Sequence, residues 1–167
     1  QPGKKLLFLG SEFGQYAERN HDRSLDWHLL EHAPHQGVRR WVHDLNRAYR
    51  EEPALHELDV EPAGFEWIEA SDSRSSVLAF LRRSRDGRWV LVLCNFTPET
   101  RHNYRVGLPV GGAWQEFLNS DADIYGGSGQ GNLGAVESAP VPYHGRAHSL
   151  VLTLPPLGVL FLRPVPE

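Results

Sequence analysis

Polar and aromatic side chains gather in one stretch of the sequence, just after the glycine that ends a short apolar run. Amide, carboxylate and imidazole groups offer hydrogen bonds to sugar hydroxyls, and an indole ring offers a stacking face. The side chains that could do this are Glu12, Gln15, Asn20, His21, Asp22, Asp26 and Trp27. Asp22, Arg23 and Asp26 could equally hold the loop in shape, and the residues alone leave both interpretations open.

Two further motifs match the sequence patterns of known binding sites but lack the secondary structure that those sites require. Residues 129–134 fit G-x-G-x-x-G, which binds dinucleotides only between a strand and the start of a helix. Because prolines and no helical period follow, we expect an ordered surface loop. Residues 28–32 fit the zinc-peptidase pattern H-x-x-E-H. We expect Pro34 to end any helix there, which leaves a short turn capped by Asp26 and no metal site.

The composition narrows the class of protein. The 167 residues include 17 Lys and Arg against 21 Asp and Glu, a net charge of −4. A binder of nucleic acid or of an anionic membrane normally carries a basic patch, and no apolar run approaches the ~20 residues that span a bilayer. The first residues also lack a signal-peptide pattern. We expect a cytoplasmic protein with no nucleic-acid, membrane or cofactor partner.

The elements that would position the polar stretch belong to residues 1–53. The apolar run 6–9 stops at Gly10 and predicts a strand buried on both faces. A helix is predicted from Val38 until Pro53 stops it, with an apolar stripe at 3.6-residue spacing. The stripe is Val38, Trp41, Val42, Leu45 and Tyr49, and the opposite face holds Arg39, Arg40, Asp44, Asn46 and Arg50. Strand, long loop and helix form one βα unit, which needs neighbouring strands.

The remainder of the chain alternates strand patterns with turn residues, which indicates an antiparallel β-sandwich. Cys94, the single cysteine, lies in the most apolar of these segments, so we expect a buried, inert side chain rather than a nucleophile. The predicted strands are residues 65–68, 77–81, 89–96, 104–108, 114–118 and 149–162, the last range divided by the turn at Pro155-Pro156.

Several stretches resemble the bacterial 1,4-α-glucan (glycogen) branching enzymes of the α-amylase clan, in order and over nearly the whole chain. They are residues 6–15 (LLFLGSEFGQ), 20–30 (NHDRSLDWHLL), 47–55 (RAYREEPAL), 92–98 (VLCNFTP), 118–128 (LNSDADIYGGS) and 152–157 (LTLPPL). The resemblance is to the C-terminal part of those enzymes. It implies that residues 1–53 are the last strand, loop and helix of a catalytic (β/α)8 barrel, and that residues 54–167 are the C-terminal all-β sandwich.

The resemblance also implies a reaction, in which an α-1,4-glucan segment is transferred to a glucose 6-hydroxyl with retention. Retaining transfer uses two carboxylates about 5–5.5 Å apart, and in the family these lie on earlier barrel strands. Their motifs are missing here, so we expect this chain to have no catalytic residues. Asp22 follows His21 but belongs to the Asn-His-Asp loop motif.

The resemblance implies that this chain contributes part of the rim of the glucan-binding cleft. The implied rim residues are Glu12, Phe13, Gln15, Tyr16, Asn20, His21, Asp22 and Trp27; Arg19 stands where the family often has an aromatic residue. The implied partner is α-glucan, bound through the parent enzyme. The predicted strand at 6–9 would have unpaired backbone groups in the isolated chain. We therefore expect it to pair with the edge strand of another copy, so that the chain self-associates.

Two alternatives remain for the sandwich. Exposed indoles stack on sugars, so Trp67, Trp89 and Trp114 could make it a carbohydrate-binding module, although such strand positions more often belong to a core. A purely structural sandwich that caps the barrel is the role we favour. The parent could also be another clan member, such as a trehalose-releasing glucan hydrolase.

Overall fold

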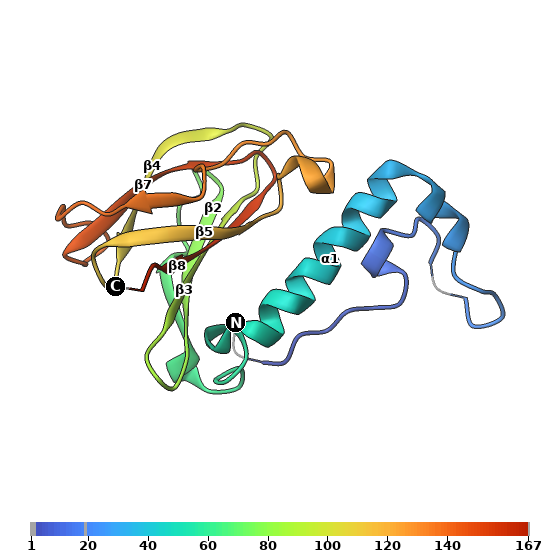
Figure 1. The fold of residues 1–167 in the computed structure, drawn as a ribbon, viewed down its shortest axis with the longest axis horizontal. Helices are drawn as coiled ribbons and strands as arrows, with labels where there is room; N and C mark the ends of the chain where they lie inside the picture. The colour runs from blue at the N-terminus through green and yellow to red at the C-terminus, as the bar shows by residue number, and fades with distance from the viewer. Residues whose placement is uncertain (1–2, 19, 167) are drawn as a thin grey trace.

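The computed structural model describes residues 3–18 and 20–166 and shows a β-sandwich with one long helix beside it (Figure 1). The helix α1 spans Ala33–Glu51. The strands are β1 (Phe65–Glu69), β2 (Val77–Arg83), β3 (Trp89–Asn95), β4 (Arg101–Leu108), β5 (Ala113–Asn119), β6 (Ala135–Glu137), β7 (His148–Leu154) and β8 (Val159–Pro164). Five 3₁₀ turns complete the described structure: η1 (Ser11–Phe13), η2 (Trp27–Glu31), η3 (Pro53–Leu55), η4 (Pro62–Gly64) and η5 (Asp123–Tyr125).

The strands form two antiparallel sheets, which confirms the predicted mainly β sandwich. One sheet has the order β1-β2-β3-β8-β5-β6, and the other pairs β4 with β7. Side chains from both sheets meet in a core that includes Leu91, Leu93, Val106, Trp114 and Leu152, each at most 1% exposed. The core position of Trp114 follows from its inward register on β5. The short strand β6, which was not predicted, extends the larger sheet beyond β5.

The outer face of the larger sheet is covered by the C-terminal end of α1 and by η3. Val90 and Val92 point to this side and are as buried as the inward residues of the same strand, because Ala54 and Leu55 pack on them. Burial on both faces explains why β3 reads as a continuous apolar run. Cys94 lies in this layer but is half-buried rather than buried as predicted. Burial still raises the pKa of its thiol to about 11, which agrees with the predicted lack of reactivity.

The helix α1 packs against the η5 turn with the face that carries Gly37, Trp41 and Asp44. The η5 turn lies along the helix, where a Cβ on Gly37 would stand 2.2 Å from the carbonyl oxygen of Tyr125. The Tyr125 ring meets Trp41 edge-on at 5.1 Å, and its hydroxyl donates to Asp44 at 2.7 Å. This hydrogen bond lowers the pKa of Asp44. Arg40 donates to the carbonyl of Ile124 at 2.9 Å. We call this contact the α1–η5 clamp.

Three predictions about the first 53 residues are wrong in detail. Leu6 to Leu9 form no strand and are 51–91% exposed; a strand buried on both faces requires neighbours to pair with, and none lies beside this segment. Pro34 does not end a helix but lies in the first turn of α1, where proline is tolerated because its missing N–H has no intrahelical partner. The turn at 27–31 is present, but the Asp26 side chain makes no capping hydrogen bond.

The glycine-rich segment 126–134 forms the expected ordered loop and leads into β6 rather than a helix. The Asp121 carboxylate organises it by accepting hydrogen bonds from the amides of Ser128 and Gln130, at 2.9 and 3.0 Å. In the described part of the chain, α1 and the shorter turns do not meet the length and apolarity of a membrane-crossing helix.

The clamp predicts that Gly37→Ala destabilises the protein although it improves the helix. Alanine is favoured over glycine by about 1 kcal/mol in a helix interior, but the new methyl group would overlap Tyr125, and such overpacking costs about 1–3 kcal/mol. We expect a lower free energy of unfolding and a lower Tm by calorimetry. Arg39→Ala, on the exposed side of the same helix, serves as control and should change little. A stabilised Gly37→Ala protein would contradict the clamp.

Candidate functional site

The loop between Gly10 and α1 folds back on the start of the helix, at the right-hand end of the molecule in Figure 1. Phe13 anchors it and is fully buried. Its carbonyl oxygen lies 2.8 Å from Nδ1 of His35 on α1, and its ring centroid lies 5.2 Å from that of Trp27. Among the predicted rim residues, Phe13 therefore has a packing role and does not face solvent.

Several of the predicted polar residues use their side chains to shape the loop. Glu12 accepts a hydrogen bond from the amide of Gly10 at 2.9 Å. Gln15 accepts one from the amide of Asp26 at 2.9 Å and so joins the two ends of the loop. Asn20 accepts one from the amide of Asp22 at 2.9 Å, an Asx turn. Glu12, Gln15 and Asn20 thus hold the loop in shape, a role that the sequence had suggested for Asp22, Arg23 and Asp26 instead.

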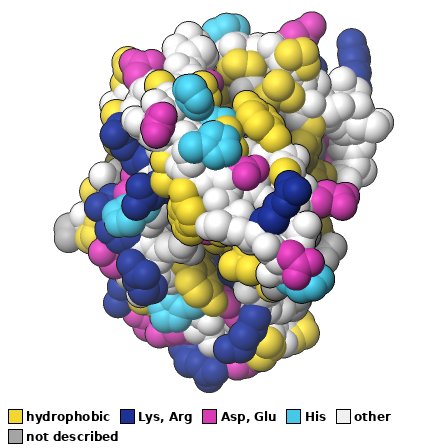
Figure 2. Space-filling model, turned by 90° about the vertical axis from the view of Figure 1, so that its right-hand side faces the viewer, with side chains coloured by type: hydrophobic (Ala, Val, Ile, Leu, Met, Phe, Trp, Pro, Cys, Tyr) yellow, Lys and Arg dark blue, Asp and Glu magenta, His cyan; other side chains and the backbone are white. Residues whose placement is uncertain are grey.

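The remaining predicted residues stand at the surface. Tyr16 is 83% and Trp27 53% exposed, and His21 lies 3.3 Å from Asp22 in an exposed pair. Figure 2 faces this end of the molecule and shows hydrophobic side chains standing among histidine and charged ones. Aromatic faces beside exposed amide and carboxylate groups suit the binding of a sugar. Arg19 lies outside the described residues.

A small hollow opens at the base of this loop. It has a volume of about 410 Å³ and is lined by Phe8, Leu9, Gly10, Ser11, Gln15, Ala17 and Glu18. Gln15 is the only one of the predicted rim residues in its lining. Across residues 3–18 and 20–166, no three His, Cys, Asp or Glu side chains come together as a metal site.

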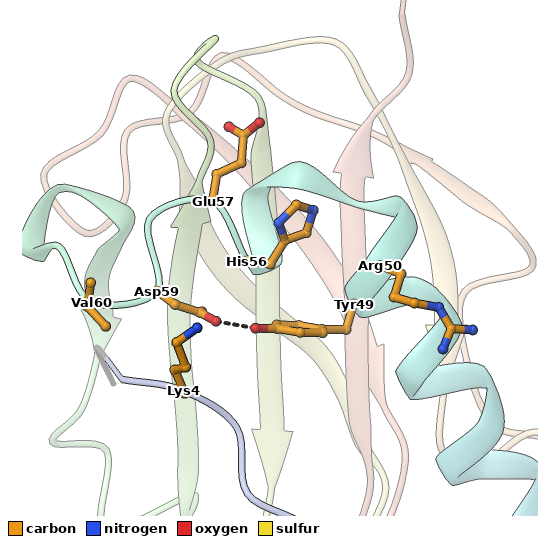
Figure 3. Close-up of a pocket in the computed structure, with 7 residues that line it drawn as sticks. All are labelled: Lys4, Tyr49, Arg50, His56, Glu57, Asp59 and Val60. Atoms are coloured by element: carbon orange, nitrogen blue, oxygen red, sulfur yellow. Dashed lines mark hydrogen bonds between the residues drawn. The ribbon is translucent and has the colours of Figure 1, made fainter.

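A second hollow, about 420 Å³, lies where residues 4–60 meet the sandwich (Figure 3). At its centre the carboxylate of Asp59 receives the Tyr49 hydroxyl from α1, Nζ of Lys5 at 2.6 Å and the Arg82 guanidinium from β2 at 2.8 Å. Asp59 and Arg82 are 6% and 3% exposed. The group joins the N-terminal segment, the helix, the connection and the sheet, and we call it the junction cluster.

The sequence analysis did not find the junction cluster. One signal was available, because Arg82 follows five apolar residues in a strand whose two faces are both covered, and a charge in that position needs a buried partner. The partner, Asp59, lies 23 residues earlier in an irregular connection, so its approach depends on the tertiary fold. Arg82 also donates from Nε to the carbonyl of Gly64 at 3.0 Å, which fixes the connection against β2.

The junction cluster predicts a loss of stability in acid. Burial acts to raise the pKa of Asp59, but hydrogen bonds from Lys5, Tyr49 and Arg82 outweigh it and lower that pKa from 3.8 to about 2. Between these values the unfolded chain binds more protons than the folded one, so the contribution, about 2 kcal/mol, is complete above about pH 5 and is lost as the pH falls towards 2.

The measurement is the free energy of urea unfolding as a function of pH. Asp59→Asn should be less stable than the parent at pH 6, because Arg82 then lacks a charged partner, and the difference should shrink between pH 4 and pH 2. A difference that stays constant over this range would contradict the assignment to Asp59. Asp123→Asn, in a turn away from the junction, is the matched control.

Comparison with known proteins adds independent information. Residues 67–165 match the family model described as "Alpha amylase, C-terminal all-beta domain". The chain is 63% identical over 163 residues to 1,4-alpha-glucan branching enzyme GlgB of Aromatoleum aromaticum, covering 98% of this chain and 26% of that protein. It is 56% identical over 163 residues to GlgB of Aquifex aeolicus, covering 97% of this chain and 26% of that protein.

A solved structure, the crystal structure of alpha-amylase from H. orenii, aligns with a TM-score of 0.42 at 21% identity over 78% of this chain and 20% of that chain. The chain spans about a quarter of the length of the curated relatives that it matches. It corresponds to the C-terminal region of the GlgB proteins.

Proposed function

Because the chain belongs to the family of alpha-amylase C-terminal all-beta domains, we propose that it serves as the C-terminal part of a 1,4-α-glucan branching enzyme. The observation that carries this proposal is the 63% identity to such an enzyme over 98% of the chain. The similarity is not confined to the sandwich and includes the loop and α1. The parent protein would transfer a segment of α-1,4-glucan to a glucose 6-hydroxyl and so create a branch.

The chain itself would not perform the chemistry. Retaining glycosyl transfer needs a nucleophilic carboxylate and an acid/base carboxylate about 5–5.5 Å apart on either side of the scissile bond. Two carboxylates of the loop have local partners, Glu12 in the Gly10 amide and Asp22 in the exposed His21. We therefore place the reactive pair on parts of the parent outside this chain and assign the exposed rim residues to contacts with α-glucan.

Residues 1–53 would complete the catalytic barrel of the parent. Two features support this role. Leu6 to Leu9 are exposed in the chain and would gain partners as a strand between neighbouring barrel strands. The apolar stripe of α1 is also incompletely covered, since Val38 is 37% exposed and Val42 and Leu45 are only half-buried. Self-association through the same apolar segment stays a prediction for the bare chain.

The sandwich would then be a structural support for the barrel. It holds α1 through the clamp and, at the C-terminal end of the helix, through the junction cluster, which leaves Val38, Val42 and Leu45 of the apolar stripe for the barrel. Arg163 of β8 adds a contact by reaching Glu52, just after the helix, at 3.0 Å. In this role the sandwich fixes the last barrel helix and contributes to stability rather than to the reaction.

A domain exchange tests the proposal. The C-terminal quarter of the Aromatoleum aromaticum enzyme is replaced by this chain, and branching is followed by the fall in amylose–iodine colour. We expect the exchanged protein to be active and the chain alone to leave the colour unchanged. A change of colour by the chain alone, or a folded but inactive exchanged protein, would overturn the proposal. The parent enzyme truncated at the same point is the control.

A second candidate function is carbohydrate binding by the sandwich, and one observation favours it. Trp67 on β1 is 43% exposed and is held in place by Phe65 and Phe80, with ring centroids at 4.9 and 5.7 Å in edge-on geometry. A fixed, exposed indole is a suitable stacking face for a pyranose ring. Trp114 is fully buried, and Trp89 is half-buried with Arg83 over its ring, so neither of them offers such a face.

This candidate predicts retardation of the chain in native gels that contain glycogen. Trp67→Ala should abolish the retardation, because the stacking face is removed while the core on the other side of β1 stays intact. Phe96→Ala, which removes another exposed aromatic ring far from Trp67 in sequence, is the control and should migrate like the parent. Equal migration of all three proteins with and without glycogen would rule out binding by the sandwich.

A further inference from the structure

A polar hollow lies between the edges of the two sheets, away from the loop and the junction cluster. Its volume is about 600 Å³, within the range of roughly 300–1,000 Å³ that small-molecule sites occupy. Its lining comes from the end of β1 and the β1–β2 connection, from the first residues of β4, and from residues 143–144. Glu69, Asp72, Arg101, Tyr104, Tyr143 and His144 are among its lining residues. We call it the side hollow.

The side hollow contains two carboxylates that are held in place and ionised. Glu69 accepts hydrogen bonds from the amide and hydroxyl of Ser71, at 2.6 and 2.8 Å, and these lower its pKa. Burial acts to raise the pKa of Asp72, but the Ser75 amide and the Tyr104 hydroxyl donate to it at 2.9 and 3.1 Å and lower that pKa overall. Each carboxylate retains lone pairs for further donors.

Donors face these acceptors from β4. The guanidinium of Arg101 is weakly held, with Nη1 3.4 Å from a Glu99 carboxylate oxygen and Nη2 3.4 Å from the carbonyl of Ser75. Its Nε is the one buried side-chain nitrogen or oxygen within residues 3–18 and 20–166 that has no hydrogen-bond partner. A guanidinium carries five N–H donors, so Arg101 has spare capacity and can turn towards a ligand oxygen.

An aromatic face completes the side hollow. Tyr143 is 42% exposed, and its ring lies 4.4 Å from that of His144. Gly107 on β4 holds the turn at 143–146 in place. A Cβ on Gly107 would stand 2.2 Å from the Tyr143 carbonyl oxygen, so the two backbones are in close contact. The Gly107 amide also donates to Nδ1 of His144 at 3.4 Å. His144 holds a left-handed φ of 49°, a conformation that costs a residue with a Cβ and is found more often at binding sites.

The carboxylates, the guanidinium and the tyrosine ring of the side hollow together indicate which class of ligand it would bind. Ionised carboxylates accept from hydroxyls, the guanidinium donates to hydroxyl oxygens, and a tyrosine ring covers the C–H face of a pyranose. The two acids and the two arginines of the lining, Arg101 and Arg105, balance in charge, so neither an anion nor a cation is favoured. We propose that the side hollow binds a neutral saccharide. Given the proposed function, on which this point rests, the saccharide is a short segment of α-glucan.

The test is a titration of the ¹⁵N-labelled chain with maltotriose, followed by NMR amide shifts. We expect saturable shifts at residues 71–75, 101–105 and 143–144. Glu69→Gln and Tyr143→Ala should weaken binding about tenfold or more, because each removes one contact of the ligand. Glu137→Gln, an exposed acid on β6, should bind like the parent, and Tyr143→Phe should restore binding because it keeps the ring.

Each outcome bears on the proposal. Absence of shifts at these residues, or shifts that persist unchanged in Glu69→Gln and Tyr143→Ala, would overturn it. Shifts confined to residues 65–67 and 80 would also overturn it and would assign the saccharide to Trp67. None of these results alters the domain exchange, which fails or succeeds on branching activity alone, so the failure of one proposal is distinguishable from the failure of the other.

Discussion

The close approach of the Tyr125 backbone to Gly37 is the contact on which the arrangement of this protein depends. A helix and a turn can lie this near only where one residue has no side chain, and the carbonyl oxygen of Tyr125 occupies that space. The Tyr125 ring and hydroxyl then reach Trp41 and Asp44 on the same face. Burial and the hydrogen bond to Asp44 both raise the pKa of Tyr125, so its hydroxyl remains a donor at any physiological pH.

Because of this contact, one face of α1 packs against the sandwich and another stays partly exposed. The face with Gly37, Arg40, Trp41 and Asp44 contacts the sandwich, whereas Val38, Val42 and Leu45 of the apolar stripe stay partly exposed. At the C-terminal end of the helix, Tyr49 belongs to both regions, because its hydroxyl donates to Asp59 in the junction cluster. A helix held in this way presents an apolar surface in a fixed orientation, which is what a partner domain such as a barrel would require.

The sequence predicted those parts of the fold that depend on local pattern. The alternation of apolar and polar residues, together with the turn residues, predicted seven of the eight strands in the described residues. The strand β3 is apolar on both faces, so its sequence alone was enough to predict it. The polar face of α1 was misjudged, because Asp44 looks like a solvated residue until the η5 turn buries it. The junction cluster was missed since Asp59 and Arg82 meet only in the tertiary fold. In the loop, residue types indicated sugar contacts, but only coordinates separate the buried Phe13 from the exposed Tyr16 and Trp27.

The contacts of α1 with η5 and with the sheet make the helix and the sandwich one rigid unit. Backbone N–H residual dipolar couplings of the weakly aligned chain test it directly, because they report the orientation of each element in solution. We expect the couplings from α1 and from the strands to fit a single alignment tensor with the orientations of the structure. Couplings from α1 that require a separate tensor, or that average towards zero, would contradict it.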